Sequence, residues 1–131
     1  MHHRLMAVAF NHTIVATRDQ EAGARFLAEV LGLPAPTRFG PFSVVALPDG
    51  ASLDYMDSDE VHPQHYAFLV SEAVFDAVTE RLRDRGVPIY ADPWHGTPGH
   101  NTNDGGRGAY FDSPEGHNLE VITRPYGSGG A

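Results

Sequence analysis

The stretch VAFNHTIVA, residues 8–16, decides the fold because a similar stretch returns as HYAFLV, residues 65–70. Both are rich in β-branched and aromatic residues, and alternation along the first would place its histidine, His12, on a mostly apolar face. The second opens with a histidine of its own, His65. The two stretches therefore predict the first strands of two copies of one unit.

The residues after the first stretch predict a helix and then three short strands. Thr17 and Gln20 have the spacing of a capping box, and apolar residues follow at helical intervals until Gly32. Gly32 should end the helix because Pro34 prevents its continuation. The strands are expected near residues 37–39, 42–47 and 51–56.

The second copy repeats this order. Ser71 can cap a helix with an apolar stripe, Gly86 ends it, and the final strand is NLEVIT, residues 118–123. Six positions match in order at offsets of 53, 54 and then 66 residues. The matched pairs are His12 and His65, Gly32 and Gly86, Pro34 and Pro88, Pro48 and Pro114, Gly50 and Gly116, and Asp54 and Glu120.

The repeat predicts an α+β fold in which two βαβββ modules pair into a cup-shaped mixed sheet. We expect one domain over residues 1–131, with modules at 8–56 and 64–124. The jump in offset places an insertion in the second module. Its position is the glycine- and proline-rich loop 93–108, which we expect to lack regular structure and which could close over a substrate.

Composition removes several classes of function. The chain has no cysteine, which excludes disulfides, thiolate metal sites and a cysteine nucleophile. All 9 basic residues are arginine and the net charge is −8, so no nucleic-acid partner is expected. Without lysine there is no Schiff-base or Walker-type chemistry. No apolar run is long enough for a signal or a membrane span, so we expect a cytoplasmic protein with no membrane partner.

Four residues stand out as candidate metal ligands or catalytic groups. His12 and Asp54 lie on the first and last strands of the first module, and His65 and Glu120 hold the equivalent places in the second. A carboxylate on a partly dry sheet face is costly unless a cation offsets it. We therefore predict that His12, His65 and Glu120 bind a divalent metal. Two imidazoles and one carboxylate suit iron, manganese, nickel, cobalt or zinc better than calcium.

Other assignments remain open at this level. A single strand histidine is more often a hydrogen-bonded core or surface residue, and a strand glutamate is usually solvated. Asp54 could be a ligand, a catalytic base or an exposed carboxylate. We interpret His117 as packing or capping the hairpin after Gly116. His2 and His3 could belong to a leader or tag and are set aside.

These stretches resemble the vicinal oxygen chelate superfamily, which includes glyoxalases, extradiol dioxygenases, fosfomycin-resistance enzymes and bleomycin-resistance proteins. The resemblance rests on FNHTIVAT (10–17), HYAFLV (65–70) and GRGAYFDSPEGHNLEVITRPYG (106–127). It implies that His12, His65 and Glu120 match the three metal-ligand positions of the family. It also implies that Asp54 matches a fourth, carboxylate ligand of glyoxalase I, where an aspartate departs from the usual glutamate.

The resemblance implies a metal-dependent lyase, isomerase or dioxygenase whose small-molecule substrate chelates the metal through neighbouring oxygens. In such an enzyme Asp54 or Glu120 would move a proton. The alternative is a non-catalytic small-molecule binder of the bleomycin-resistance type, although such binders generally lack the metal triad. The family also implies a homodimer, with each metal site lying within one chain or across two.

Overall fold

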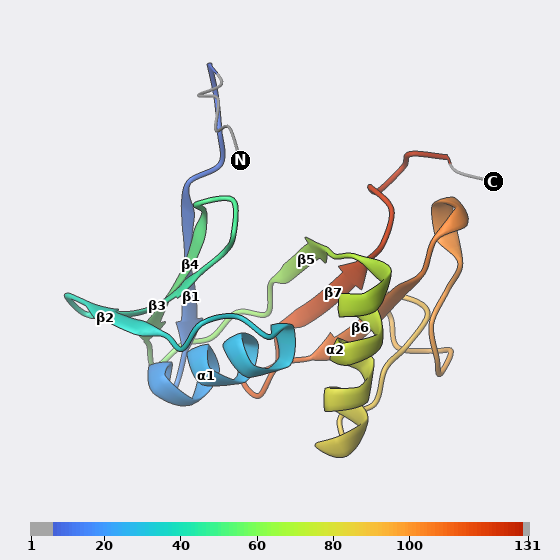
Figure 1. The fold of residues 1–131 in the computed structure, drawn as a ribbon. Coiled ribbons are helices and arrows are strands. Elements are labelled where there is room, and N and C mark those ends of the chain that lie inside the picture. Colours follow the sequence, from blue (N-terminus) through green and yellow to red (C-terminus); the bar gives the residue numbers. More distant parts are fainter. Residues whose placement is uncertain (1–6, 130–131) are drawn as a thin grey trace.

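The computed structural model describes residues 7–129, so His2 and His3 lie outside it. Two successive modules make up the chain (Figure 1). The first contains β1 (His12–Thr17), α1 (Gln20–Leu31), β2 (Thr37–Phe39), β3 (Phe42–Ala46) and β4 (Ser52–Asp57). The second contains β5 (His65–Leu69), α2 (Glu72–Asp84), the short 3-10 helix η1 (Asn103–Gly105), β6 (Gly108–Asp112) and β7 (Asn118–Ile122).

The strands form two mixed sheets, with orders β1-β4-β3-β2 and β5-β7-β6. In both sheets the first strand runs parallel to the last, and the last runs antiparallel to the strand before it. Tyr90 exchanges two backbone hydrogen bonds with Tyr110 at the outer edge of β6, where the first sheet has β2. The predicted α+β fold of two βαβββ modules with mixed sheets is confirmed.

The register of the strands explains the sequence offsets. Asp54 and Glu120 hold equivalent places in the two modules, each lying opposite the residue two positions after the strand histidine. The equivalent pairs are His12 with Ser52 and Ile14 with Asp54 in the first sheet, and His65 with Asn118 and Ala67 with Glu120 in the second. The modules therefore present equivalent groups at equivalent places.

The first strand begins later than its sequence pattern predicts. Residues 8–11 precede β1, and Val8 and Phe10 are exposed. The physical reason is the length of the partner strand: β4 starts at Ser52, opposite His12, after the turn that contains Gly50. Earlier residues therefore have no strand to pair with.

The start of α1 corrects one detail of the prediction. The N-cap is Asp19, whose side chain accepts a hydrogen bond from the Ala22 amide, rather than Thr17. The Thr17 hydroxyl instead donates to the Glu115 carboxylate at 3.0 Å, a contact with the other module that no local pattern could reveal. Gly32 ends α1 in the left-handed conformation, as expected.

The second helix also follows its prediction. Ser71 accepts a hydrogen bond from the Val74 amide and so caps α2. Of the helices within residues 7–129, none combines the length and apolar character that crossing a bilayer requires.

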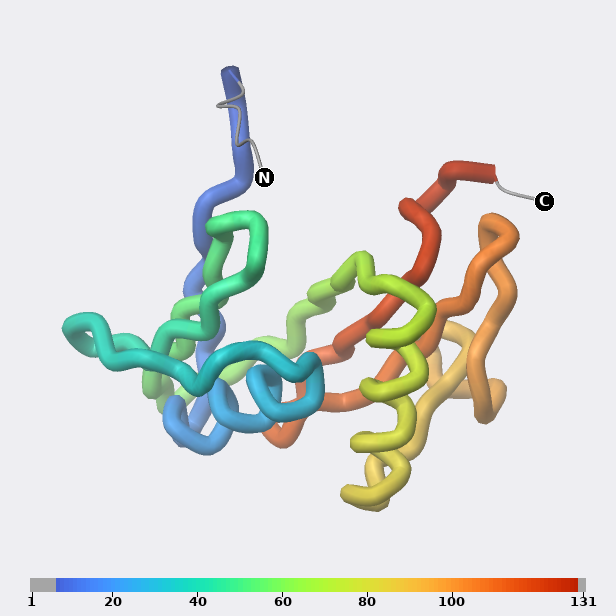
Figure 2. The backbone as a smooth tube through the Cα atoms, viewed as in Figure 1, coloured from blue at the N-terminus to red at the C-terminus, as the bar shows by residue number. Residues whose placement is uncertain are grey.

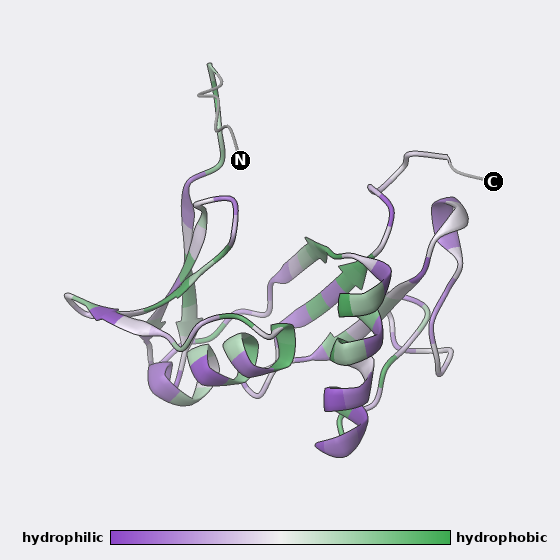
Figure 3. Ribbon diagram, viewed as in Figure 1, coloured by the Kyte–Doolittle hydropathy of each residue, from purple (hydrophilic) through white to green (hydrophobic). Residues whose placement is uncertain are grey.

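One hydrophobic core extends through both modules. Val15, Leu53 and Tyr55 fill the face of the first sheet beneath α1. Phe26 of α1 meets Phe111 of β6 with ring centroids 6.4 Å apart, which joins the two halves of the core. Figure 3 shows the last turn of α1 and the ends of β5 and β7 as hydrophobic, and the outer turn of α2 as hydrophilic. The opposite faces carry no α-helix: Ile14 of β1 and Leu69 of β5 are exposed there, whereas Tyr110 and Glu120 are buried.

His117 fastens the modules to each other. Its Nε2 lies 2.8 Å from the Ala16 carbonyl of β1, and its Nδ1 accepts the Gln64 amide at 3.0 Å. The carbonyl requires a proton on Nε2, so the ring is the neutral Nε2–H tautomer with both nitrogens engaged. At 1% exposure, His117 has a structural place beside the hairpin, which agrees with its sequence interpretation.

Candidate metal site

His65 and Glu120 meet on the face of the second sheet that carries no α-helix. The parallel pairing of β5 with β7 places them two register positions apart, with His65 Nε2 3.1 Å from Glu120 Oε1. On its other side, His65 Nδ1 lies 2.8 Å from the backbone carbonyl of Asn118. A carbonyl can only accept a hydrogen bond, so Nδ1 carries a proton and Nε2 is the ring nitrogen that faces the carboxylate.

The contact of Nε2 with the carboxylate at 3.1 Å requires either a proton on Nε2 or a metal ion, because a bare nitrogen and a carboxylate oxygen are both acceptors. A second proton on His65 would satisfy this need, and so would a metal ion bound by both atoms. The Nδ1–H contact to a backbone carbonyl is the arrangement that commonly orients a metal-binding imidazole. Glu120 is only 5% exposed, so its charge has little water to stabilise it. The pair therefore fits a divalent metal.

Tyr110 completes this part of the site, and the sequence interpretation missed it. It lies opposite Glu120 in the β6–β7 hairpin, and its ring stacks on His65 with centroids 5.7 Å apart. Burial, followed by the negative charge of Glu120, raises the pKa of Tyr110 to about 12. The phenol therefore stays protonated at neutral pH and can donate a hydrogen bond. The sequence could have identified Tyr110, because a hairpin that turns at Pro114–Gly116 places residue 110 opposite residue 120.

His12 and Asp54 form a second pair of polar groups, on the open face of the first sheet. Both line a hollow of about 460 Å³ together with Ile14. The Ser52 hydroxyl donates to Asp54 Oδ1 at 2.7 Å, and His12 Nδ1 lies 2.7 Å from Asn11 Oδ1. These hydrogen bonds orient both side chains on the face that carries no helix.

One chain alone does not bring the predicted ligands together. Within residues 7–129, no three ligating side chains converge in a way that could hold a metal ion. His65 and Glu120 are adjacent, whereas His12 lies on the other sheet beside Asp54. The structure thus places the predicted ligands in two separate pairs, one per module, with His12 and Asp54 on one sheet and His65 and Glu120 on the other.

The histidines of loop 93–108 have other contacts. His95 lies 2.9 Å from the Asn118 side chain and stacks on Tyr90 with centroids 4.4 Å apart. His100 meets Phe75 of α2 edge-on. Figure 2 shows the yellow and orange chain between α2 and β6 on the far side of β6 from β5. Apart from η1 and isolated bridges the loop is irregular, as predicted.

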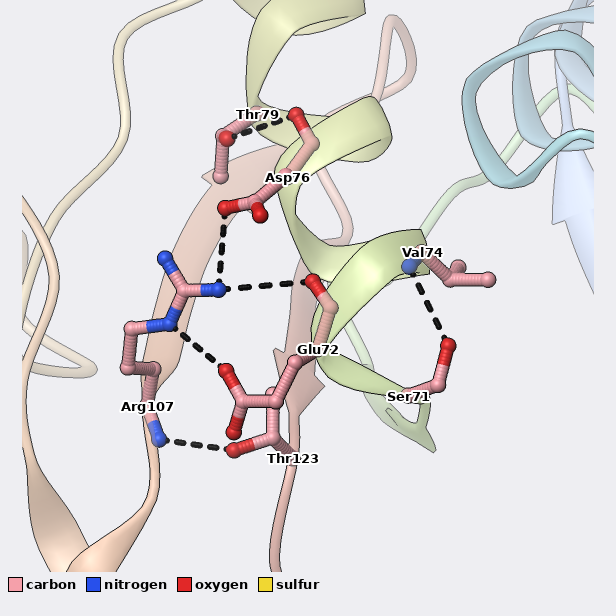
Figure 4. A network of polar contacts seen from close by, with 7 residues as sticks. All are labelled: Ser71, Glu72, Val74, Asp76, Thr79, Arg107 and Thr123. Carbon is pink, nitrogen blue, oxygen red and sulfur yellow. Dashed lines mark hydrogen bonds and ion pairs between the residues drawn. The ribbon is translucent and has the colours of Figure 1, made fainter.

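Arg107 anchors the end of this loop to α2 (Figure 4). Its guanidinium contacts the Glu72 carboxylate at 2.8 Å and the Asp76 carboxylate at 2.9 Å, and it lies 4.4 Å from the centre of the Phe75 ring. Its backbone amide also donates to the Thr123 hydroxyl. The charge of Arg107 is therefore already neutralised by α2.

Comparison with known proteins agrees with this architecture. A family model described as the glyoxalase/bleomycin resistance protein/dioxygenase superfamily matches residues 9–121. Two solved structures, Oxidase ChaP-H1 and Oxidase ChaP-H2, are 56% and 59% identical, with TM-scores of 0.90 and 0.91. The first match covers 92% of this chain and 99% of the other, and the second covers 95% and 100%.

A more distant relative has a different activity in its name. Glutathione transferase FosA of Serratia marcescens is 28% identical over 123 residues, which covers 88% of this chain and 81% of the relative. Relatives of this chain are therefore named both as oxidases and as a transferase, so relatedness alone does not define a reaction.

Proposed function

Since this chain belongs to the glyoxalase/bleomycin resistance protein/dioxygenase superfamily, we propose that it is a metal-dependent oxidase acting on a small molecule with two neighbouring oxygen atoms. The observation that carries the proposal is the contact of His65 Nε2 with Glu120 Oε1, 3.1 Å apart, at a carboxylate that is only 5% exposed. The choice of oxidase rests on the names of two relatives that are more than half identical.

The proposed ligands are His12, His65 and Glu120. A divalent ion held by two imidazoles and one carboxylate would polarise the substrate oxygens and, if it is iron or manganese, provide a redox centre for oxidation by dioxygen. We therefore favour these two metals over nickel, cobalt and zinc. The protein positions the donors: the Asn118 carbonyl fixes the tautomer of His65, and β7 holds Glu120 beside it.

Asp54 is the proposed proton acceptor. Its carboxylate lies on an open face and is oriented by the Ser52 hydroxyl, so one oxygen stays available for a proton from a substrate hydroxyl. Glu120 is the other carboxylate that could move a proton, but binding a metal would leave it less free. Tyr110, protonated at neutral pH, can donate a hydrogen bond to a substrate oxygen.

We propose that the complete site lies across a homodimer. The half-site with His12 and Asp54 and the half-site with His65 and Glu120 occupy equivalent places in their sheets. A twofold arrangement would place the first half-site of one copy over the second half-site of the other, twice. Exposed apolar side chains on the first sheet, Ile14 at 49% and Phe39 at 73%, are consistent with a covered face.

Mixing two inactive variants tests this arrangement. His12→Ala and His65→Ala should each fail to hold metal. A mixed dimer would contain one site with both substitutions and one intact site, built from His12 of one copy and His65 with Glu120 of the other. Recovery of metal and of substrate-dependent oxygen uptake after subunit exchange would support the proposal. If mixed dimers verified by mass spectrometry recover neither metal nor activity, the site is not shared between the two subunits.

The oxidation itself is tested with an oxygen electrode. Iron- or manganese-loaded protein is mixed with catechols and hydroxyquinones, whose adjacent oxygens can chelate a metal. Oxygen consumption that Glu120→Gln abolishes would support the oxidase. Tight binding of these compounds without oxygen consumption would instead support the non-catalytic binding protein.

A further inference from the structure

Besides the hollow on the first sheet, a small cavity lies beside Glu120 on the second sheet. It lies between hairpin 101–108 and the segment that follows Ile122, and its wall includes Tyr110 and Glu120 themselves. Its volume is about 40 Å³, which is small beside the hollow of about 460 Å³ on the first sheet. The cavity is therefore suited to a polar substituent rather than to a whole substrate molecule.

The wall of this cavity is held in place by Asp104. The carboxylate accepts the Gly127 amide at 3.1 Å and the Gly129 amide at 2.8 Å, which ties the C-terminal segment to the hairpin. Asp104 itself adopts a left-handed φ of 58°, a conformation that is uncommon for a residue with a side chain. The segment that carries Arg124 and Tyr126 is therefore fastened beside Glu120.

Glycine at position 106 permits this close approach. A Cβ atom there would lie 2.5 Å from Arg124 Cγ and 2.5 Å from Thr123 Oγ1. Because such contacts are too short, any larger residue would push the Arg124 segment outward.

Two arginines line the cavity, and they differ in what their charge contacts. Arg107 is neutralised by Glu72 and Asp76 of α2 (Figure 4). Arg124, in contrast, has no carboxylate within ion-pair distance among residues 7–129. Arg124 is therefore the cation at this cavity that remains available to a ligand.

We propose that this cavity is a specificity subsite, in which Arg124 binds a carboxylate substituent of the substrate while the neighbouring oxygens of the same molecule reach the metal beside Glu120. The inference rests on the proposed function and adds the substrate class: a small chelating molecule with an acidic group on the side of the C-terminal segment. A planar guanidinium suits this task because it binds a carboxylate through two hydrogen bonds.

Two probes that differ by one carboxylate test the subsite. Catechol and 3,4-dihydroxybenzoate share the chelating hydroxyls, and their Kd values are measured by calorimetry on zinc-loaded protein, where no oxidation interferes. We expect Arg124→Gln to reduce the preference for the acid about tenfold relative to the native protein, the size of one charge-assisted contact. The Kd of catechol should stay unchanged, and Arg124→Lys should recover part of the preference.

Arg83→Gln is the matched control, since it removes the same charge from the last turn of α2, outside the cavity. It should keep the native preference. The subsite is refuted if Arg124→Gln also keeps the native preference, or if it weakens the binding of both probes by the same factor. Chelation of the metal by the probes would stand in either case.

If neither probe binds, chelation itself fails, and a metal-independent measurement decides the subsite. Benzoate and benzamide are then titrated into isotope-labelled protein, and the NMR signals of the Arg124 side chain and the Gly127 amide are followed. The subsite is supported if benzoate shifts these signals and benzamide does not, and if benzoate no longer shifts the Gly127 amide in Arg124→Gln. No difference between the two compounds would overturn it.

Discussion

Replacement of His117 by phenylalanine separates a structural histidine from a metal-binding one. The substitution keeps a ring of similar size in the core but removes both hydrogen bonds, to the Ala16 carbonyl and from the Gln64 amide. Each unpaired backbone group costs about 1–3 kcal/mol, so we expect a loss of about 2–4 kcal/mol in the free energy of unfolding after partial access of water. The β1 strand and the linker before β5 would no longer be joined through the side chain of residue 117.

Urea unfolding in the presence of a chelator measures this loss without a contribution from bound metal. His62→Phe is the control: His62 is an exposed linker histidine, so its replacement should change stability by less than about 0.5 kcal/mol. Folded His117→Phe should still take up metal. An unchanged midpoint, or loss of metal from a fully folded variant, would refute the structural assignment of His117.

Further predictions concern the site and the inserted loop. Because the pKa of Tyr110 is raised from 10.0 to about 12, its contribution to stability is complete below pH 10 and is lost as the pH rises toward 12. Removing the negative charge in Glu120→Gln should lower the pKa of Tyr110, which the ultraviolet absorbance of tyrosinate would show, and an unchanged titration would contradict the contact. Arg107→Gln should release loop 93–108 from α2 and accelerate its cleavage by a protease, with Glu72→Gln giving a similar result. Equal cleavage rates for the native protein, Arg107→Gln and Glu72→Gln would show that these ion pairs do not hold the loop.

The repeat made the modules and their equivalent positions predictable. The offset between Asp54 and Glu120 exceeds that between His12 and His65 mainly because loop 93–108 intervenes, and strand pairing restores the equivalence. Local patterns also identified Ser71 and Gly32 as helix ends, because caps depend on neighbours in sequence.

Contacts between distant residues were not predictable in the same way. Thr17 has the pattern of a helix cap, yet its hydroxyl contacts Glu115, 98 positions away, and Asp19 caps the helix instead. Local spacing carries no information about such a partner. Likewise, the sequence predicted His12 and His65 as equivalent positions but could not show that one chain leaves them on separate sheets.

The most direct test of a metal site is the metal content of the purified protein. Protein prepared without chelator or nickel resin is analysed for all elements beside His65→Ala and the control His62→Ala, with folding checked by circular dichroism. We predict near-stoichiometric iron or manganese in the native protein and in His62→Ala, and its loss from folded His65→Ala. Absence of metal from the native protein, together with no uptake when metals are added back, would contradict the account.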